Sequence, residues 1–187
     1  MEREASARIR VYRELLLTWS AKINLIGPEA RRHIDEHIEE GIAAARVLRP
    51  DGEVLDVGSG GGLPAIPMAI VSPEARFHLV EADRRKWAFL KQVIRECSLN
   101  SVAHGDRLAN VIGRLDPDLL FQLVTSRAVG HPEQWIPLVL PHLAGLGKVA
   151  LFQTGRDVPD VAGLEIDRTE VLPRGESNFL QILRRST

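Results

Sequence analysis

The chain has 187 residues and a nearly balanced charge, with 24 lysines and arginines against 25 aspartates and glutamates. This length suits one α/β domain, with or without a small extension, and argues against two full-size domains. Hydrophobic residues make up 44% of the chain and charged residues 26%, which is typical of a folded globular protein. The protein is no polycation, so any contact with nucleic acid must come from a local basic patch.

The cysteine and histidine contents favour a reducing compartment and no metal site. One cysteine, Cys97, excludes an internal disulfide framework. The six histidines are scattered, and His33 and His37 lack the glutamate of a zinc-binding HEXXH motif. The charged N-terminal stretch is unlike a secretory signal, and no apolar run reaches the ~18 residues of a membrane span. We therefore expect a soluble, cytoplasmic protein without a metal.

Two helices are expected before the first strand, over residues 2–20 and 28–48, the second opening with a proline suited to a first helical turn. After the turn LRPDG, strand and helix patterns alternate, which is typical of a parallel sheet covered by helices. The expected strands cover residues 53–57, 77–80, a short run near 102, 121–125 and 148–152. The expected helices cover residues 65–71, 84–97, 108–115 and 133–142.

The end of the chain departs from this alternation. Residues 165–172 and 178–183 are two strand-like runs separated by PRGES, which is the spacing of a hairpin. The sequence therefore predicts an α/β fold with a doubly wound sheet that ends in an antiparallel hairpin. Residues 1–50 are expected to form an N-terminal helical extension, and residues 51–187 the main domain.

A glycine-rich turn, DVGSGGGLP, follows the first strand and precedes a helix. Gly58, Gly60 and Gly62 can adopt positive φ and let a ligand approach the backbone, beside the unpaired N–H groups of the helix start. A doubly wound sheet binds its ligand at this point. The dinucleotide pattern G-x-G-x-x-G would need a glycine where this chain has Leu63, which disfavours a nicotinamide enzyme. A tight turn without a ligand is the alternative.

Glu81 directly follows the second strand, 23 residues after Gly58. A carboxylate at that edge can accept hydrogen bonds from both hydroxyls of a ribose. The alternative is a strand-end carboxylate that pairs with Arg84 or Arg85. The glycine turn and the acid together favour a nucleoside ligand.

These features, with the terminal hairpin, resemble the Rossmann-like class I S-adenosylmethionine-dependent methyltransferases. The segments DVGSGGGLPAIPMAI, EADRRKWAFLKQV and VTSRAVG, with LLLTWSAKINLIG and EHIEEGI upstream, resemble more closely the bacterial small-subunit ribosomal RNA guanine-N7 methyltransferases, also called glucose-inhibited division protein B. The resemblance covers residues 15–152, and the first helices match that family's N-terminal extension. It implies methyl transfer from S-adenosylmethionine to guanine N7 in 16S ribosomal RNA, with that RNA or the small ribosomal subunit or its precursor as partner.

The resemblance also implies roles for single residues in holding the cofactor. Gly58 and Leu63 would contact its methionine end, with Gly60 and Gly62 in the same turn. Leu108 and Ala109 would frame its adenine. Glu81 would hold its ribose.

Arg127, in TSRA, is implied to lie in the active site. A planar guanidinium there can pair with the cofactor carboxylate or hold a phosphate, and an arginine that ties the strand end to a neighbouring acid is the alternative. Guanine N7 carries an unprotonated lone pair, so the reaction needs no general base and positioning is most of the task.

The candidates for RNA contact are basic residues on two predicted helices. Arg31 and Arg32 precede the sheet, Arg84 and Arg85 follow the second strand, and His37 matches a histidine of the family. For each basic cluster a solvated helix face is the alternative.

The chain departs from the family pattern at Glu36, Ala109, Gln122 and Thr154. Two rival functions therefore remain: a cofactor-binding homologue with a lost or changed RNA substrate, and a methyltransferase that acts on a small molecule or a protein.

Overall fold

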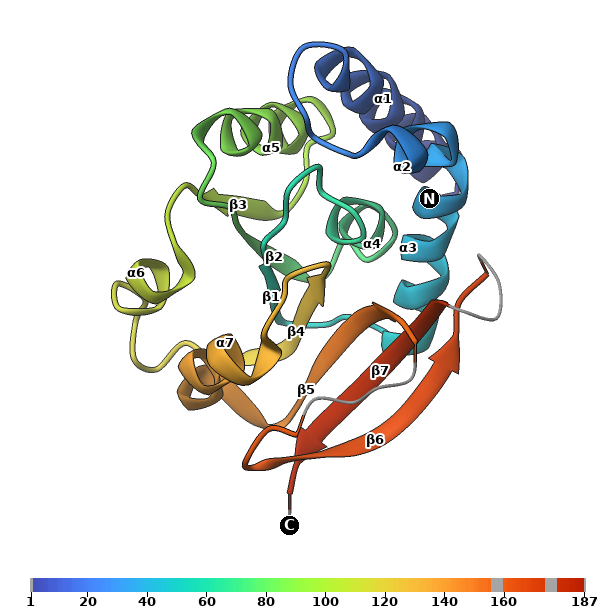
Figure 1. The fold of residues 1–187 in the computed structure, drawn as a ribbon. Coiled ribbons are helices and arrows are strands. Elements are labelled where there is room, and N and C mark those ends of the chain that lie inside the picture. The colour runs from blue at the N-terminus through green and yellow to red at the C-terminus, as the bar shows by residue number, and fades with distance from the viewer. Residues whose placement is uncertain (1, 156–159, 174–177, 187) are drawn as a thin grey trace.

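The computed structural model describes residues 2–155, 160–173 and 178–186. Within them, one seven-stranded sheet with the order β3-β2-β1-β4-β5-β7-β6 crosses the molecule (Figure 1). The strands are β1 (Glu53–Val57), β2 (Arg76–Val80), β3 (Ser101–His104), β4 (Phe121–Arg127), β5 (Leu143–Thr154), β6 (Leu164–Val171) and β7 (Asn178–Arg185).

The pairing of the strands confirms the expected doubly wound sheet with a terminal antiparallel hairpin. β1 pairs in parallel with β2 and β4, and the same direction continues to β3 and β5. β7 runs antiparallel to both β5 and β6. Residues 174–177, in the predicted turn PRGES, lie outside the described residues.

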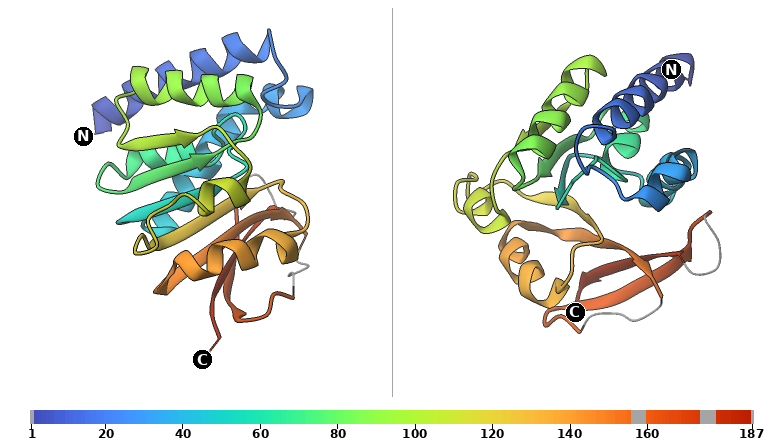
Figure 2. Two further views of the ribbon diagram at one scale, coloured as in Figure 1. Left: turned by 90° about the vertical axis from the view of Figure 1, so that its left-hand side faces the viewer. Right: turned by 45° about the horizontal axis from the view of Figure 1, so that its top comes forward.

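Helices cover both faces of the sheet (Figure 2). They are α1 (Glu2–Ser20), α2 (Pro28–Arg32), α3 (Ile34–Leu48), α4 (Ala65–Val71), α5 (Arg84–Glu96), α6 (Leu108–Ile112), α7 (Pro132–Val139) and the 3-10 turn η1 (Leu140–His142). Among the helices of the described residues, none is long and apolar enough to cross a membrane.

Each face of the sheet has its own hydrophobic core. Val54 in β1 belongs to the core under α1, α3, α4 and α5, whereas its neighbour Leu55 belongs to the core under α6 and α7. This follows from the alternation of side chains along a strand. The helices of residues 1–50 thus share a core with the sheet, and the division of the chain near residue 50 stays a prediction.

The single helix expected over residues 28–48 is wrong, because the helix is interrupted at His33, where φ is −112° and ψ is 30°. α2 buries none of its side chains, whereas α3 buries seven residues. The direction of α3 is therefore set by packing against the core rather than by local helix propensity.

Smaller differences concern the ends of elements. β4 runs on to Arg127. β5 already begins at Leu143, so Gly145 and Gly147 lie inside the strand, where its pairing with β4 shifts in register. The helix expected over residues 133–142 tightens into η1, which contains Pro141, a residue without an N–H for α-helical bonding. The helices expected to end at 97 and 115 end at Glu96 and Ile112.

Candidate active site

The glycine turn after β1 has three residues in the left-handed region, with φ of 72° at Gly58, 53° at Gly60 and 81° at Gly62. A Cβ on Gly58 would collide with Val129, and one on Gly62 with Ile66. A Cβ on Gly60 would meet no atom closer than 3.8 Å. Packing therefore requires glycine at the two ends of the turn, whereas Gly60 has room for a Cβ without a clash.

Glu81, at the end of β2, is bonded directly to this turn. Its Oε2 accepts a 2.8 Å hydrogen bond from the Gly60 N–H, and its Oε1 accepts one of 2.8 Å from the Asp83 N–H. Among the described residues its partners are thus backbone groups, and the expected alternative of an ion pair with Arg84 or Arg85 is wrong. The structure brings two predicted cofactor residues, Gly60 and Glu81, into contact.

Asp56 is a buried acid beside the glycine turn that the sequence analysis did not single out. It is buried in β1, where the Thr125 hydroxyl donates a 2.6 Å hydrogen bond to its Oδ1 and the Ser59 hydroxyl donates to its backbone carbonyl. Burial raises the pKa of this carboxyl to about 6, against the opposing effect of the Thr125 and Ser59 hydroxyls. The available signal was an acid within the apolar run VLDV next to the glycine turn.

The residues expected to frame an adenine lie one strand further along. β3 pairs with β2, and the Glu81 N–H donates to the His104 carbonyl at 3.0 Å. Leu108 and Ala109 form the first turn of α6, the helix that follows β3, and Leu108 is half-buried while Ala109 is exposed. Leu63 is half-buried at the end of the glycine turn.

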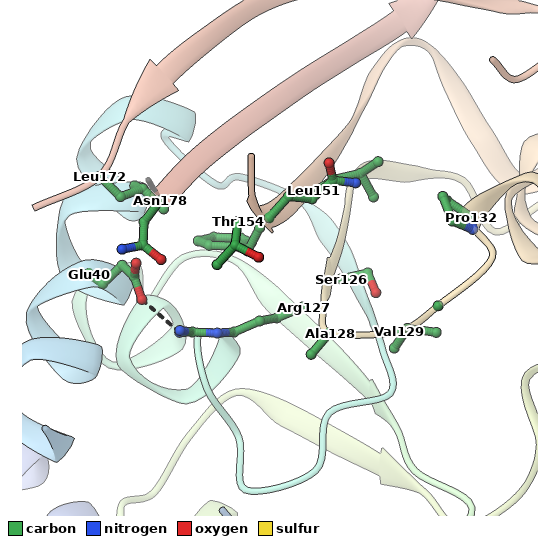
Figure 3. Close-up of a pocket in the computed structure, with 13 residues that line it drawn as sticks. Glu40, Ser126, Arg127, Ala128, Val129, Pro132, Leu151, Thr154, Leu172 and Asn178 are labelled. Atoms are coloured by element: carbon green, nitrogen blue, oxygen red, sulfur yellow. Dashed lines mark ion pairs between the residues drawn. The ribbon is translucent and has the colours of Figure 1, made fainter. Parts of the chain in front are cut away.

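A cavity of about 470 Å³ opens at the carboxyl ends of β4 and β5 (Figure 3). Arg127, the last residue of β4, extends into it. The walls of the cavity come from α3, from the end of β4 and the segment that follows it, from β5, from Leu172 after β6 and from the start of β7. They are Glu40, residues 126–130, Pro132, residues 151–154, Leu172 and Asn178.

Arg127 is held by two residues of α3. Its Nη1 lies 2.7 Å from Glu40 Oε2, and its Nη2 lies 2.7 Å from His37 Nδ1. His37 Nδ1 also lies 3.3 Å from Glu40 Oε2, so the three side chains form one polar cluster. The structure therefore contains the ion pair that the sequence analysis gave as the alternative role of Arg127, and the acid in this pair is Glu40.

The sequence comparisons agree with this geometry. The model of the family described as "GidB: rRNA small subunit methyltransferase G" matches residues 5–166. The chain belongs to this family. The Ribosomal RNA small subunit methyltransferase G of Cereibacter sphaeroides is 35% identical over 165 residues, which are 83% of this chain and 74% of that protein. The protein of the same name from Helicobacter bizzozeronii is 31% identical over 148 residues, or 79% and 81% of the two chains.

Solved structures share the fold at low identity. A variant of MtNAS in complex with S-adenosylmethionine matches with a TM-score of 0.67 and 15% identity over 97% of this chain and 76% of that one. A putative methyltransferase, yhhF, from Escherichia coli matches with a TM-score of 0.63 and 18% identity over 79% and 86%. The class I methyltransferase fold predicted from the sequence is confirmed.

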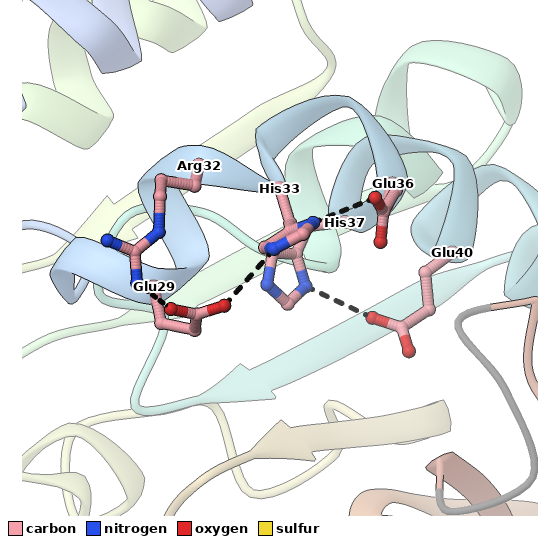
Figure 4. Close-up of polar contacts among 6 residues, drawn as sticks. All are labelled: Glu29, Arg32, His33, Glu36, His37 and Glu40. Carbon is pink, nitrogen blue, oxygen red and sulfur yellow. Dashed lines mark hydrogen bonds and ion pairs between the residues drawn. The ribbon is translucent and has the colours of Figure 1, made fainter.

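Of the residues predicted to bind RNA, the four arginines are exposed and His37 is buried. Arg31 and Arg32 are exposed on α2. Arg31 donates to the Ser20 carbonyl at the end of α1. Arg32 pairs with Glu29 (Figure 4). His37 is 4% exposed and lies beside the cavity rather than on the surface.

Arg84 and Arg85 are exposed at the start of α5. Arg85 and Lys86 line a surface depression of about 220 Å³ together with Ile23 and Asn24 of the segment between α1 and α2. The basic start of α5 therefore adjoins the chain segment that leads to α2.

The four departures from the family pattern fall in different places. Thr154 lines the cavity, and Ala109 is on the exposed face of α6. Gln122 is at the opposite end of β4 from the cavity, where its Oε1 accepts a 2.7 Å hydrogen bond from the Glu53 N–H. Glu36 lies 2.8 Å from His33 on the exposed side of α3.

No group of three or more His, Cys, Asp or Glu side chains is arranged to hold a metal ion within residues 2–155, 160–173 and 178–186.

Proposed function

We propose that this protein transfers a methyl group from S-adenosylmethionine to N7 of a guanine in small-subunit (16S) ribosomal RNA, presented as free RNA or within the small ribosomal subunit or its precursor. Membership of the family supports the reaction. The observation that carries the proposal for this chain is the glycine turn bonded to Glu81, next to the cavity that holds Arg127.

The residues present fit S-adenosylmethionine. The open face of Gly60 leaves room for the methionine end, and Leu63 closes the same turn. Glu81 is held by backbone N–H groups at the end of β2 and offers acceptors for ribose hydroxyls. Leu108 and Ala109, after the neighbouring strand, would frame the adenine.

The proposed reaction requires the protein mainly to position the cofactor and the base. The bound cofactor supplies an electrophilic methyl group on a positively charged sulfur. The lone pair of guanine N7 forms the new N–C bond while the S–C bond breaks and its electrons return to sulfur. No proton leaves, so no general base is needed, and the residues of the cavity orient the base and exclude water.

The test is methyl transfer from labelled S-adenosylmethionine to small-subunit RNA, and to small-subunit particles, from cells that lack this protein. We expect label in the RNA and strand cleavage at one guanine after borohydride and aniline treatment, which reports N7 methylation. Cofactor binding without transfer to either substrate would overturn the proposal and favour a homologue with a lost or changed substrate, either a small molecule or a protein.

A further inference from the structure

The ion pair between Glu40 and Arg127 joins α3 of the helical extension to the end of β4, at the wall of the cavity. Glu40 is 1% exposed, and only 20% of the Arg127 side chain is exposed. Both side chains line the cavity at the carboxyl end of β4 (Figure 3). The guanidinium beside it stabilises a carboxylate so deeply buried.

The next residue of α3 fixes Glu40 in place. A Cβ on Gly41 would lie 2.9 Å from the Pro64 carbonyl and 3.0 Å from Pro67 Cβ, so α3 approaches the start of α4 as closely as glycine permits. Pro64 directly precedes α4, which follows the glycine turn. α3 is therefore seated on the segment that would hold the cofactor, and it presents Glu40 to Arg127 from there.

In the proposed reaction, positive charge passes from the cofactor to the guanine, and we place that guanine in the cavity beside the Glu40–Arg127 pair. Before transfer the positive charge is on the cofactor sulfur, and afterwards it is on the methylated guanine ring. A lone guanidinium beside the base would oppose that movement. A carboxylate 2.7 Å from the guanidinium offsets its field.

We infer that Glu40 is a positioning residue for methyl transfer, which holds Arg127 against the wall of the cavity and offsets its charge as positive charge develops on the guanine. This inference rests on the proposed function. Glu40 acts through Arg127 and needs no contact with the base.

The first test compares Glu40→Gln with Glu39→Gln, which makes the same charge change on an exposed neighbour in the same helix. With ribosomal RNA at saturating cofactor, Glu40→Gln is expected to lower kcat at least tenfold while KM for RNA changes less than threefold. Glu40→Asp, which keeps the charge, is expected to recover most of the rate. Wild-type kcat in a folded Glu40→Gln protein, or an equal loss in Glu39→Gln, would overturn the inference.

The second test does not depend on activity. The Nε–H resonance of Arg127 is assigned in the NMR spectrum by its loss in Arg127→Lys, and it is expected to shift and exchange faster with water in Glu40→Gln but not in Glu39→Gln. If the wild-type protein methylates no RNA, the proposed function fails and this spectrum alone decides whether Glu40 positions Arg127. An unchanged resonance in Glu40→Gln would overturn that role.

Discussion

The hydroxyl of Tyr12 in α1 donates a 2.7 Å hydrogen bond to the carbonyl of Gly61, 49 residues away in the glycine turn. Both residues are buried, and a Cβ on Gly61 would meet Ile26 and Leu16 at 3.0 and 3.2 Å. The helical extension therefore packs against the turn at Gly61, while the neighbouring Gly60 has room for a Cβ without a clash.

Tyr12→Phe should weaken both the fold and cofactor binding. Burial raises the pKa of the Tyr12 hydroxyl well above 10, so the wild-type hydroxyl stays protonated and donates over the physiological pH range. Its removal leaves the buried Gly61 carbonyl without this bond, at a cost of about 1–3 kcal/mol in the free energy of unfolding. Urea denaturation and titration calorimetry measure the two effects. Thr18→Val, which removes an exposed hydroxyl of the same helix, is the control and should change neither.

Gly60→Val should abolish binding of S-adenosylmethionine in a protein that still folds. The new side chain would occupy the open face of the turn, and its positive φ would cost about 1–3 kcal/mol of stability. Gly27→Val is the control, because Gly27 has a φ of −60° and no atom lies within 4 Å of its Cβ position. Unchanged affinity of folded Gly60→Val, measured by calorimetry, would rule out this placement of the cofactor.

Glu81→Gln should lower cofactor affinity by about 1.5–3 kcal/mol, or roughly ten- to hundredfold, because charged hydrogen bonds to the ribose are weakened. Glutamine is a milder change than alanine, since it keeps one acceptor oxygen for the Gly60 or Asp83 N–H, whereas alanine would leave both N–H groups without their acceptor. Calorimetry of Glu81→Gln beside the exposed control Glu74→Gln gives the difference. Equal affinities would mean that Glu81 only braces the turn.

Stability should fall as the pH drops below about 6.5 because of a histidine pair in the sheet. His78 Nε2 lies 2.7 Å from Glu53 Oε2, and His78 Nδ1 lies 3.1 Å from His104 Nε2. Burial lowers the pKa of both histidines. The unfolded chain therefore takes up protons, near the ordinary histidine pKa of about 6.5, that the folded protein excludes. Denaturation at pH 7.5, 6.5 and 5.5 should show a smaller decline in His78→Gln.

Asp56 titrates in the same window with the opposite sign. Its folded-state pKa is raised to about 6, so the folded protein binds this proton more readily, and stability rises as pH falls from there toward the ordinary carboxyl pKa. The histidine comparison is therefore made in an Asp56→Asn background. An identical pH dependence with and without His78 in that background would contradict the prediction.

Association with ribosomal RNA or its particle should weaken steeply with salt. Each phosphate contact that is removed should flatten the log–log slope by roughly 0.7–0.9, so Arg32→Gln or Arg85→Gln should each produce a change of that size while cofactor affinity is kept. Arg31→Gln is a poorer test, since Arg31 also donates to the end of α1. Arg95→Gln, at the other end of α5, is the control for filter binding. Binding that is absent or independent of salt would remove RNA as the substrate.

The sequence by itself determined the elements whose signals are local. The predicted bounds of β1 and α4 agree with the structure, because the apolar run before the glycines and the proline after them mark both ends. The alternation of strands and helices and the hairpin spacing likewise follow from periods of two and 3.6 residues. The motifs around Gly58 and Arg127 were sufficient to indicate the family.

Only the tertiary structure decided which distant groups meet. Helical periodicity continues through His33, so the break there follows from the way α3 packs rather than from a local signal. The contacts of Tyr12 with Gly61 and of Glu40 with Arg127 join segments far apart in sequence, and no periodicity specifies such a pairing. They arise because α1 and α3 bury their apolar faces against the same core as α4, which brings both helices to the edge of the sheet where the glycine turn and the end of β4 lie.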